Sequence, residues 1–413
     1  MRLLLVRFAT AMGAGLPVGF SAAQGTFPLR HQPFDFWQNK AVFDAAGAWL
    51  PYADRPAGVR LPSGFLRDVT YFRAPVGPRT ALVALERSGA GRLVADTNGD
   101  GDLSDEKPLT ASAAPLTWNG ETIRLRRFGP IEWTREPPRG RPGVRVYLYL
   151  RPGWRPSLFM HAAEACVGEA TFDGRRHRIA LLDANLDGRY DSFARLSPAR
   201  DGGLTPGADV LAIDRDGDGR FGEDYARSGG FEVQPLTRVL RVGNDYHDVR
   251  VGPDGSSIGF EKARIQTGVL EVGDPAVTLT LLSDSGVQYL AGNGGRWHLP
   301  TGEYSVWGLA LRAVDSNGQD VTLQGKAGPS ARRFTIEAGR STLLRLGQPL
   351  TVKTTTRLRR GLLGRSVEVD FGFTGQGGEE YERWAYGARP ELPRVQIYDE
   401  SGKLLASGKF EYG

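Results

Sequence analysis

Short stretches in which apolar and polar residues alternate dominate the pattern of this sequence. The stretches 144–150, 177–182, 277–282 and 303–307 alternate wholly or in part, and 209–213 is an aspartate followed by a short apolar run. Successive side chains of a β-strand point to opposite faces of the sheet, so this period indicates strands with one buried face. We therefore predict a mainly β protein with a multidomain, β-sandwich-like architecture.

Length and turn content divide this pattern into several domains. At 413 residues the chain exceeds one ordinary domain of roughly 100–200 residues. Its 55 glycines and 26 prolines supply the frequent turns of an all-β fold. We expect β domains over 24–130 and 131–263, a β-sandwich over 264–349, and a C-terminal β segment over 350–413. Two questions stay open: whether 24–263 is one domain or two, and whether 350–413 completes the sandwich or forms a small immunoglobulin-like domain.

One part of the sequence resembles a known class of module. Gly268-Val-Leu-Glu-Val, Trp297-His-Leu-Pro-Thr-Gly-Glu-Tyr-Ser-Val and Phe334-Thr-Ile-Glu-Ala-Gly follow one another along the chain. This line resembles a transthyretin-like or carboxypeptidase-regulatory-like module, in which a strand that begins Pro-x-Gly-x-Tyr is common. The resemblance covers residues 265–349 and implies a transthyretin- or immunoglobulin-like sandwich there.

The N-terminus has the features of a secretory signal. Arg2 and Arg7 are followed by an apolar stretch and by small residues suited to cleavage after Ala23. We therefore expect residues 1–23 to be a signal peptide of a bacterial-type exported protein that is secreted, periplasmic or on the cell surface. The alternatives are a buried first strand and a cytosolic arm. No later stretch has 18 uncharged apolar residues, so we expect no membrane span after signal removal.

Three stretches share a spacing that is typical of calcium loops. They begin at Asp96, Asp183 and Asp214, with an acid or amide at positions 1, 3 and 5, glycine at 6 and an apolar residue at 8. Ca²⁺ takes six to eight oxygens at about 2.3–2.6 Å, and glycine permits the sharp turn that aims alternate side chains inward. Other Asp-Gly pairs, at 173, 201 and 254, lack these ligands and indicate plain turns. We predict Ca²⁺ in loop 1 (residues 96–106), loop 2 (183–191) and loop 3 (214–224).

The expected ligands are the side chains at positions 1, 3 and 5, the backbone carbonyl at position 7, and a nearby acid that closes the site. They are Asp96, Asn98, Asp100, Asp102, Asp105 and Glu106 in loop 1; Asp183, Asn185, Asp187, Arg189 and Asp191 in loop 2; and Asp214, Asp216, Asp218, Arg220, Glu223 and Asp224 in loop 3. The five carboxylates of loop 1 would repel one another unless a cation lies among them. Loop 2 is the weakest candidate, because it has three acids with an arginine beside them.

The loops resemble the calcium-binding half of EF-hand, dockerin or thrombospondin type 3 repeats. Position 12, where an EF-hand has a bidentate glutamate, is Lys107, Ala194 or Tyr225. Each loop follows a strand-like stretch, so no helix pair is present to open, and we expect structural sites rather than a switch. Calcium-binding β-propeller blades are the alternative. The loop starts are 87 and 31 residues apart, however, whereas blades repeat at a fixed period.

Charge and cysteine content narrow the partners. The net charge is +5, and the basic clusters at 175–178 and 357–360 lie beside strand-like runs, which favours solvated sheet faces over a nucleic-acid site. A single cysteine, Cys166, excludes an intrachain disulfide and a cysteine-based zinc cluster, and we expect it to be a small buried residue. An exported chain without disulfides needs another source of stability, and bound Ca²⁺ would supply it.

No linear catalytic motif is present, and the five histidines are scattered. We therefore expect no catalytic residues and an exported calcium-binding β protein that binds a cell-surface protein or another partner. The alternative is a carbohydrate-binding or carbohydrate-active protein, in which Trp118, Trp133 or Trp154 stacks on sugars. A hydrolase without linear motifs is a third hypothesis, since two carboxylates suffice for glycoside cleavage. The sequence leaves the oligomeric state open.

Overall fold

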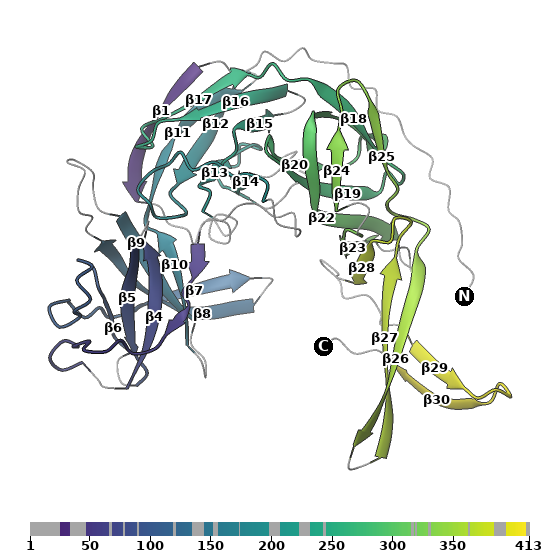
Figure 1. Ribbon diagram of the computed structural model, residues 1–413, viewed down its shortest axis with the longest axis horizontal. Helices are drawn as coiled ribbons and strands as arrows, with labels where there is room; N and C mark the ends of the chain where they lie inside the picture. The colour runs from purple at the N-terminus through teal and green to yellow at the C-terminus, as the bar shows by residue number, and fades with distance from the viewer. Residues whose placement is uncertain are drawn as a thin grey trace.

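The fold is mainly β, as predicted, and most of its strands are arranged in antiparallel sheets (Figure 1). The computed structural model describes residues 25–33, 47–65, 68–76, 79–88, 91–118, 121–133, 144–151, 156–172, 174–197, 207–222, 232–242, 245–314, 318, 320–328, 332–361, 364–383 and 394–409. Across these ranges the only helix is a short 3₁₀ turn, η2 (Asn293–Gly295). The expected signal peptide and the proline-glycine block at 137–143 lie outside the described residues.

Two sheets form a β-sandwich in the N-terminal part. One contains β3 (Tyr52–Ala53), β4 (Val69–Val76), β5 (Arg79–Glu86) and β6 (Leu93–Ala95), in that order. The other contains β2 (Gly47–Trp49), β10 (Ser157–Ala162), β9 (Val144–Arg151), β8 (Glu121–Trp133) and β7 (Ser112–Trp118). Both sheets contribute to one apolar core that includes Phe72, Val83, Phe128 and Leu148.

The expected boundary at residues 130–131 falls inside a strand. Gly129 and Pro130 lie within β8, where the register with β9 shifts between Phe128 and Ile131. Proline cannot donate to the ladder, but a bulge removes the need for that hydrogen bond. The strands before and after this position therefore share one sheet, although a glycine-proline pair usually marks a turn.

An eight-stranded sheet curls over a second core. Its order is β14 (Val233–Pro235), β13 (Val210–Ile213), β12 (Arg175–Leu182), β11 (Glu164–Phe172), β1 (Gly25–Pro33), β17 (Ser257–Lys262), β16 (Asp245–Val251) and β15 (Val239–Val242). Strand β1 pairs with β11 through one half of its length and with β17 through the other. Phe172 and Ile179 from one half of the sheet pack in the same core as Ile258 and Phe260 from the other. The core thus lies inside the curl.

The C-terminal part contains a second pair of sheets that share a core. The smaller sheet is β21 (Arg296–Pro300), β18 (Thr267–Val272) and β25 (Ser341–Leu344). The larger one is β20 (Gly286–Leu290), β19 (Val277–Ser283), β22 (Gly302–Val314), β23 (Asp320–Lys326), β28 (Glu380–Arg383), β27 (Gly364–Thr374) and β26 (Thr351–Gly361), with β24 (Arg333–Ile336) beside β22. Leu279, Trp297, Tyr304 and Leu311 are buried between them.

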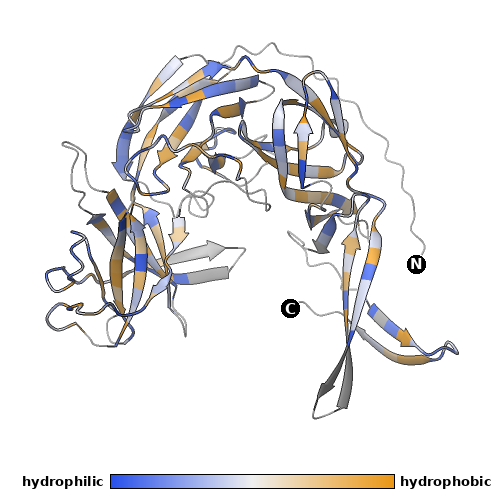
Figure 2. Cartoon of the chain, in the orientation of Figure 1, coloured by the Kyte–Doolittle hydropathy of each residue, from blue (hydrophilic) through white to orange (hydrophobic). Residues whose placement is uncertain are grey.

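Residues 350–383 therefore contribute strands β26, β27 and β28 to the sheet of the preceding sandwich. The last strands, β29 (Arg394–Tyr398) and β30 (Leu404–Lys409), form a separate two-stranded sheet. Figure 2 shows apolar and polar residues interleaved along many of the strands, as the period of two in the sequence predicts.

Candidate metal centre

Each of the three loops leaves the end of a strand. Loop 1 follows β6, loop 2 follows β12 and loop 3 follows β13, which confirms the expected β flanks. Because β12 and β13 are antiparallel, loops 2 and 3 lie at opposite ends of this strand pair. The residue at position 8 is buried in every loop: Leu103, Tyr190 and Phe221. These side chains anchor the loops to the cores, while positions 1, 3 and 5 remain available for polar contacts.

Loop 3 is a tight turn built on carboxylates. The Asp214 carboxylate accepts hydrogen bonds from the N–H groups of Gly217 at 2.8 Å and Gly219 at 2.9 Å. Asp216 accepts from the N–H of Asp218 at 3.1 Å. Gly217 and Gly219 have φ of 77° and 80°, in the left-handed region that side chains other than glycine rarely adopt. The glycines of the motif are therefore required by the backbone.

This turn brings three acids together. Asp214, Asp216 and Asp218 each offer a carboxylate oxygen within 4.8 Å of the other two. Asp214 is buried, Asp216 is half-buried and Asp218 is exposed. Among the residues that the structure describes, these are the only three acid, histidine or cysteine side chains brought together in this way. Three like charges at this separation repel one another, and a cation among them would relieve that repulsion.

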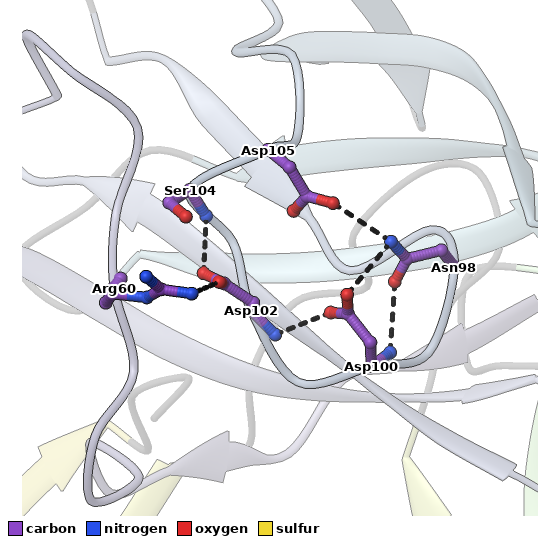
Figure 3. A network of polar contacts seen from close by, with 6 residues as sticks. All are labelled: Arg60, Asn98, Asp100, Asp102, Ser104 and Asp105. Carbon is purple, nitrogen blue, oxygen red and sulfur yellow. Dashed lines mark hydrogen bonds and ion pairs between the residues drawn. The ribbon is translucent and has the colours of Figure 1, made fainter.

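Loop 1 has the same skeleton but a different charge balance. Asp96 accepts from the N–H groups of Gly99 and Gly101, at 2.7 and 3.1 Å. The side-chain amide of Asn98 donates to Asp100 at 3.2 Å and to Asp105 at 3.1 Å (Figure 3). A carboxamide in position 3 thus bridges two carboxylates, so loop 1 lacks the three-carboxylate group of loop 3.

A basic residue from outside loop 1 also contacts it. Arg60 forms a hydrogen-bonded ion pair with Asp102 (Figure 3). The N–H and hydroxyl of Ser104, followed by Arg60, hold the pKa of Asp102 below its usual value. The prediction that the five carboxylates of loop 1 need a cation among them therefore left out Arg60. Part of their charge is balanced by the protein itself.

Loop 2 departs furthest from a cation site. Asp183 accepts from the N–H groups of Asp187 and Gly188, at 3.0 and 2.6 Å. Position 4 is Leu186, which has φ of 55°, an uncommon conformation for a branched side chain. Asp191, the predicted closing acid, is held by the Arg189 guanidinium through two contacts of 2.9 and 2.6 Å. Its oxygens are thus already engaged.

Two buried acids that the spacing did not identify face loops 2 and 3. Asp209 is fully buried, and Glu232 is 2% exposed. Burial, together with the nearby charges of Asp183 and Asp187, raises the pKa of Asp209 to about 8, although hydrogen bonds from two N–H groups oppose the shift. The Asp209 carboxyl group is therefore held mostly in its neutral form at pH 7. Glu223 and Asp224, the predicted closing acids of loop 3, lie outside the described residues.

Trp133, one of the tryptophans considered for sugar stacking, is 3% exposed and belongs to the core. Its indole N–H donates to the backbone carbonyl of Asp96 at 2.7 Å, which fastens loop 1 to β8. This contact makes Trp133 a structural residue of the loop. Trp154 and the side chain of Trp118 lie outside the described part of the chain.

The cysteine is buried, as predicted. Cys166 has no exposed surface, and burial raises the pKa of its thiol to about 12. Both ring nitrogens of His31 lie 3.4–3.5 Å from the sulfur. The thiolate is the nucleophilic form of cysteine, and this environment disfavours it. The contact with His31 therefore does not produce an activated nucleophile.

Comparisons of the chain with protein-family models, curated proteins and solved structures found no match. Among the described residues, no helix is long and apolar enough to cross a membrane. The feature of this chain that points to a function is the geometry of the loops, above all the acidic group of loop 3.

Proposed function

We propose that this chain is an exported, non-catalytic β protein in which Ca²⁺ bound by loop 3 stabilises the curled sheet. Loops 1 and 2 are weaker or secondary sites in this proposal. The observation that carries it is the convergence of the Asp214, Asp216 and Asp218 oxygens within 4.8 Å on a turn anchored by buried Phe221.

The ligand chemistry favours Ca²⁺ over other ions. The acidic group of loop 3 consists of carboxylates alone, and hard oxygen ligands suit Ca²⁺ and Mg²⁺ rather than zinc, which prefers nitrogen and sulfur. Mg²⁺ demands near-ideal octahedral geometry and releases its water reluctantly. A turn that offers several protein oxygens at once fits the larger ion with its flexible coordination.

A structural role follows from the way the loop is attached. Loop 3 continues directly from β13, and its apolar position 8 is fixed in the core, so the strand that precedes the loop is held in place when the ion binds. An ion that binds only the folded state stabilises it by about 1.4 kcal/mol at 1 mM Ca²⁺, for a dissociation constant of 0.1 mM. This is a useful contribution for a protein with one cysteine and no intrachain disulfide.

Export is supported by the basic, apolar and small-residue order of residues 1–23, and extracellular Ca²⁺ is in the range at which such weak sites fill. The partner in this proposal is a protein at the cell surface. The transthyretin-like resemblance agrees with this role, since the sandwich around Leu279 and Tyr304 would present an adhesive or assembly surface.

Carbohydrate binding is the second candidate, and two exposed rings favour it. Trp49 and Tyr52 are 55% and 51% exposed, and each ring also contacts an aromatic neighbour, Phe159 or Phe72. Exposed, supported rings can stack on sugar faces. A glycan array with the wild-type protein and Trp49→Ala would separate the candidates: saccharide binding that depends on Trp49 favours this second function over the first.

The calcium proposal is tested by melting the purified protein in EGTA and in 1 mM Ca²⁺. We expect Ca²⁺ to raise the melting temperature of the wild type, and Asp214→Ala to lose that rise. The matched control is Asp399→Ala, which removes an aspartate whose carboxylate accepts from Ser401 and Lys403 in an ordinary exposed turn. Equal calcium effects in all three proteins would contradict the proposal.

A further inference from the structure

A buried glutamate outside the loop 3 spacing bonds the backbone of that loop. One oxygen of Glu232 accepts the N–H groups of Arg215 at 2.7 Å and Asp216 at 3.2 Å, and the other accepts the N–H of Gly222 at 2.6 Å. These are positions 2, 3 and 9 of the loop. The glutamate thus joins the beginning of the turn to its end.

The other two loops have an acid in the same role. In loop 2, Asp209 accepts the N–H groups of Ala184 at 3.3 Å and Ser192 at 2.8 Å, which are positions 2 and 10. In loop 1, Glu106 accepts the N–H groups of Thr97 and Asn98, positions 2 and 3. The N–H at position 2 is therefore bound by a carboxylate in all three loops.

These acids share a place in the sheet rather than a spacing in the sequence. They follow position 1 of their loops by 10, 26 and 18 residues. The pair Leu182 and Val210 in the β12–β13 ladder places Asp209 across from the first aspartate of loop 2. The bridge between Leu93 and Leu109 places Glu106 across from Asp96, the first aspartate of loop 1. Glu232 lies across from Ile213, the residue that precedes the first aspartate of loop 3.

We infer that Glu106, Asp209 and Glu232 are positioning residues, which hold the three loops in their ion-binding shape before any ion binds. The hydrogen bonds that the Asp209 and Glu232 side chains accept are shielded from water, and a hydrogen bond in such surroundings is stronger than one exposed to solvent. Many metal loops fold only when the metal supplies the energy. Here the return strand supplies a fixed hydrogen-bond acceptor that fastens the start of the turn.

The consequence for binding rests on the proposed function. A loop that is already ordered loses less conformational freedom when it captures an ion, so its affinity is higher for the same ligands. Glu232 would then raise the affinity of loop 3 through the backbone at Arg215 and Asp216. The order of the loop itself does not depend on whether Ca²⁺ binds, and this allows the two ideas to be tested separately.

The test measures amide hydrogen exchange of the full-length protein in EGTA at Arg215, Asp216 and Gly222. We expect these amides to be protected in the wild type without any ion, and to exchange roughly 10- to 100-fold faster in Glu232→Gln, in which a side-chain NH₂ group replaces one accepting oxygen. The matched control is Glu261→Gln, because Glu261 is an exposed residue that forms an ion pair with Arg250 at the surface. It should exchange as the wild type does.

Two results would overturn the inference: unchanged exchange in Glu232→Gln, or wild-type amides that become protected only after Ca²⁺ is added. If Glu232→Gln does not fold, Asp209→Asn gives the same test through the amides of Ala184 and Ser192.

Titrating the same samples with Ca²⁺ measures the effect on binding separately. Glu232→Gln should weaken binding at loop 3 about tenfold, with partial recovery in Glu232→Asp. Protected amides in a protein that binds no Ca²⁺ would refute only the proposed function.

Discussion

Replacing Asp216 by asparagine should separate ion binding from loop folding. The other two loops already have asparagine in this position, and Asn98 and Asn185 accept the N–H of position 5 at 3.0 and 2.8 Å, as Asp216 does at 3.1 Å. Asp216→Asn therefore keeps the turn and removes one negative charge from the acidic group. In EGTA we expect its stability to equal or slightly exceed that of the wild type, because a repulsion is lost.

The size of the calcium effect follows from the charge that is removed. One unit charge about 4 Å from a cation near a protein surface is worth a few kcal/mol before desolvation, so a tenfold loss of affinity is a conservative expectation. With a dissociation constant that rises from about 0.1 to about 1 mM, the stabilisation at 1 mM Ca²⁺ falls from about 1.4 to about 0.4 kcal/mol. For a domain of 150–250 residues that unfolds as one unit, this difference of about 1 kcal/mol corresponds to about 2–4 °C in melting temperature.

The assay is a series of thermal melts at increasing Ca²⁺ concentration, with EGTA as the starting point, for the wild type and Asp216→Asn. We expect both curves to begin at nearly the same temperature and the wild-type curve to rise more steeply. Asp399→Ala serves as the control for loss of an aspartate in a turn. A calcium-dependent rise in Asp216→Asn that equals the wild-type rise would refute the role of the acidic group.

Contacts of Trp133, Arg60 and Cys166 can each be tested separately. Tb³⁺ bound in loop 1 should show emission sensitised by Trp133, whose indole N–H donates to the Asp96 carbonyl at 2.7 Å. Trp133→Phe should abolish this emission, and unchanged emission would place the ion elsewhere. Arg60→Ala should tighten cation binding at loop 1 roughly two- to fivefold in a Tb³⁺ titration, because the Arg60 guanidinium competes with the ion for Asp102. An unchanged affinity would show that this ion pair does not affect cation binding. Cys166 should resist alkylation at pH 8 until the protein unfolds, because a thiol pKa of about 12 leaves about one part in 10⁴ ionised. Rapid labelling of the native protein at pH 8 would contradict the burial of this thiol. Because the thiol pKa is higher in the folded protein than in the unfolded chain, the free energy of unfolding should also fall as the pH rises from about 9 towards 12.

The sequence predicts the fold class well because the signal is local. A strand with one buried face must alternate, and stretches such as 177–182 and 277–282 became β12 and β19. The order of the strands depends on contacts between distant residues. Strand β1 lies between β11 and β17, which are far from it along the chain, and no local pattern indicates that pairing.

The loops were predictable for the same reason, and their partners were not. Acids at positions 1, 3 and 5 lie within a few residues, so a spacing rule finds them. Asp209 and Glu232 have a fixed place in the ladder but a variable distance from their loops, and Arg60 reaches Asp102 from a separate segment. The local motif therefore located the site, whereas the fold determines which residues shape it and balance its charge.

Equilibrium dialysis of the EGTA-treated full-length protein against ⁴⁵Ca²⁺ measures directly whether the loops bind the ion. The wild type should bind at least one Ca²⁺ with a dissociation constant of about 0.1–1 mM. A variant with Asp214, Asp216 and Asp218 all changed to asparagine should lose one bound ion while keeping the exchange protection of the β12–β13 ladder. Binding of no Ca²⁺ by the wild type at millimolar concentration, or an undiminished number of bound ions in the variant, would contradict the assignment of a Ca²⁺ site to loop 3.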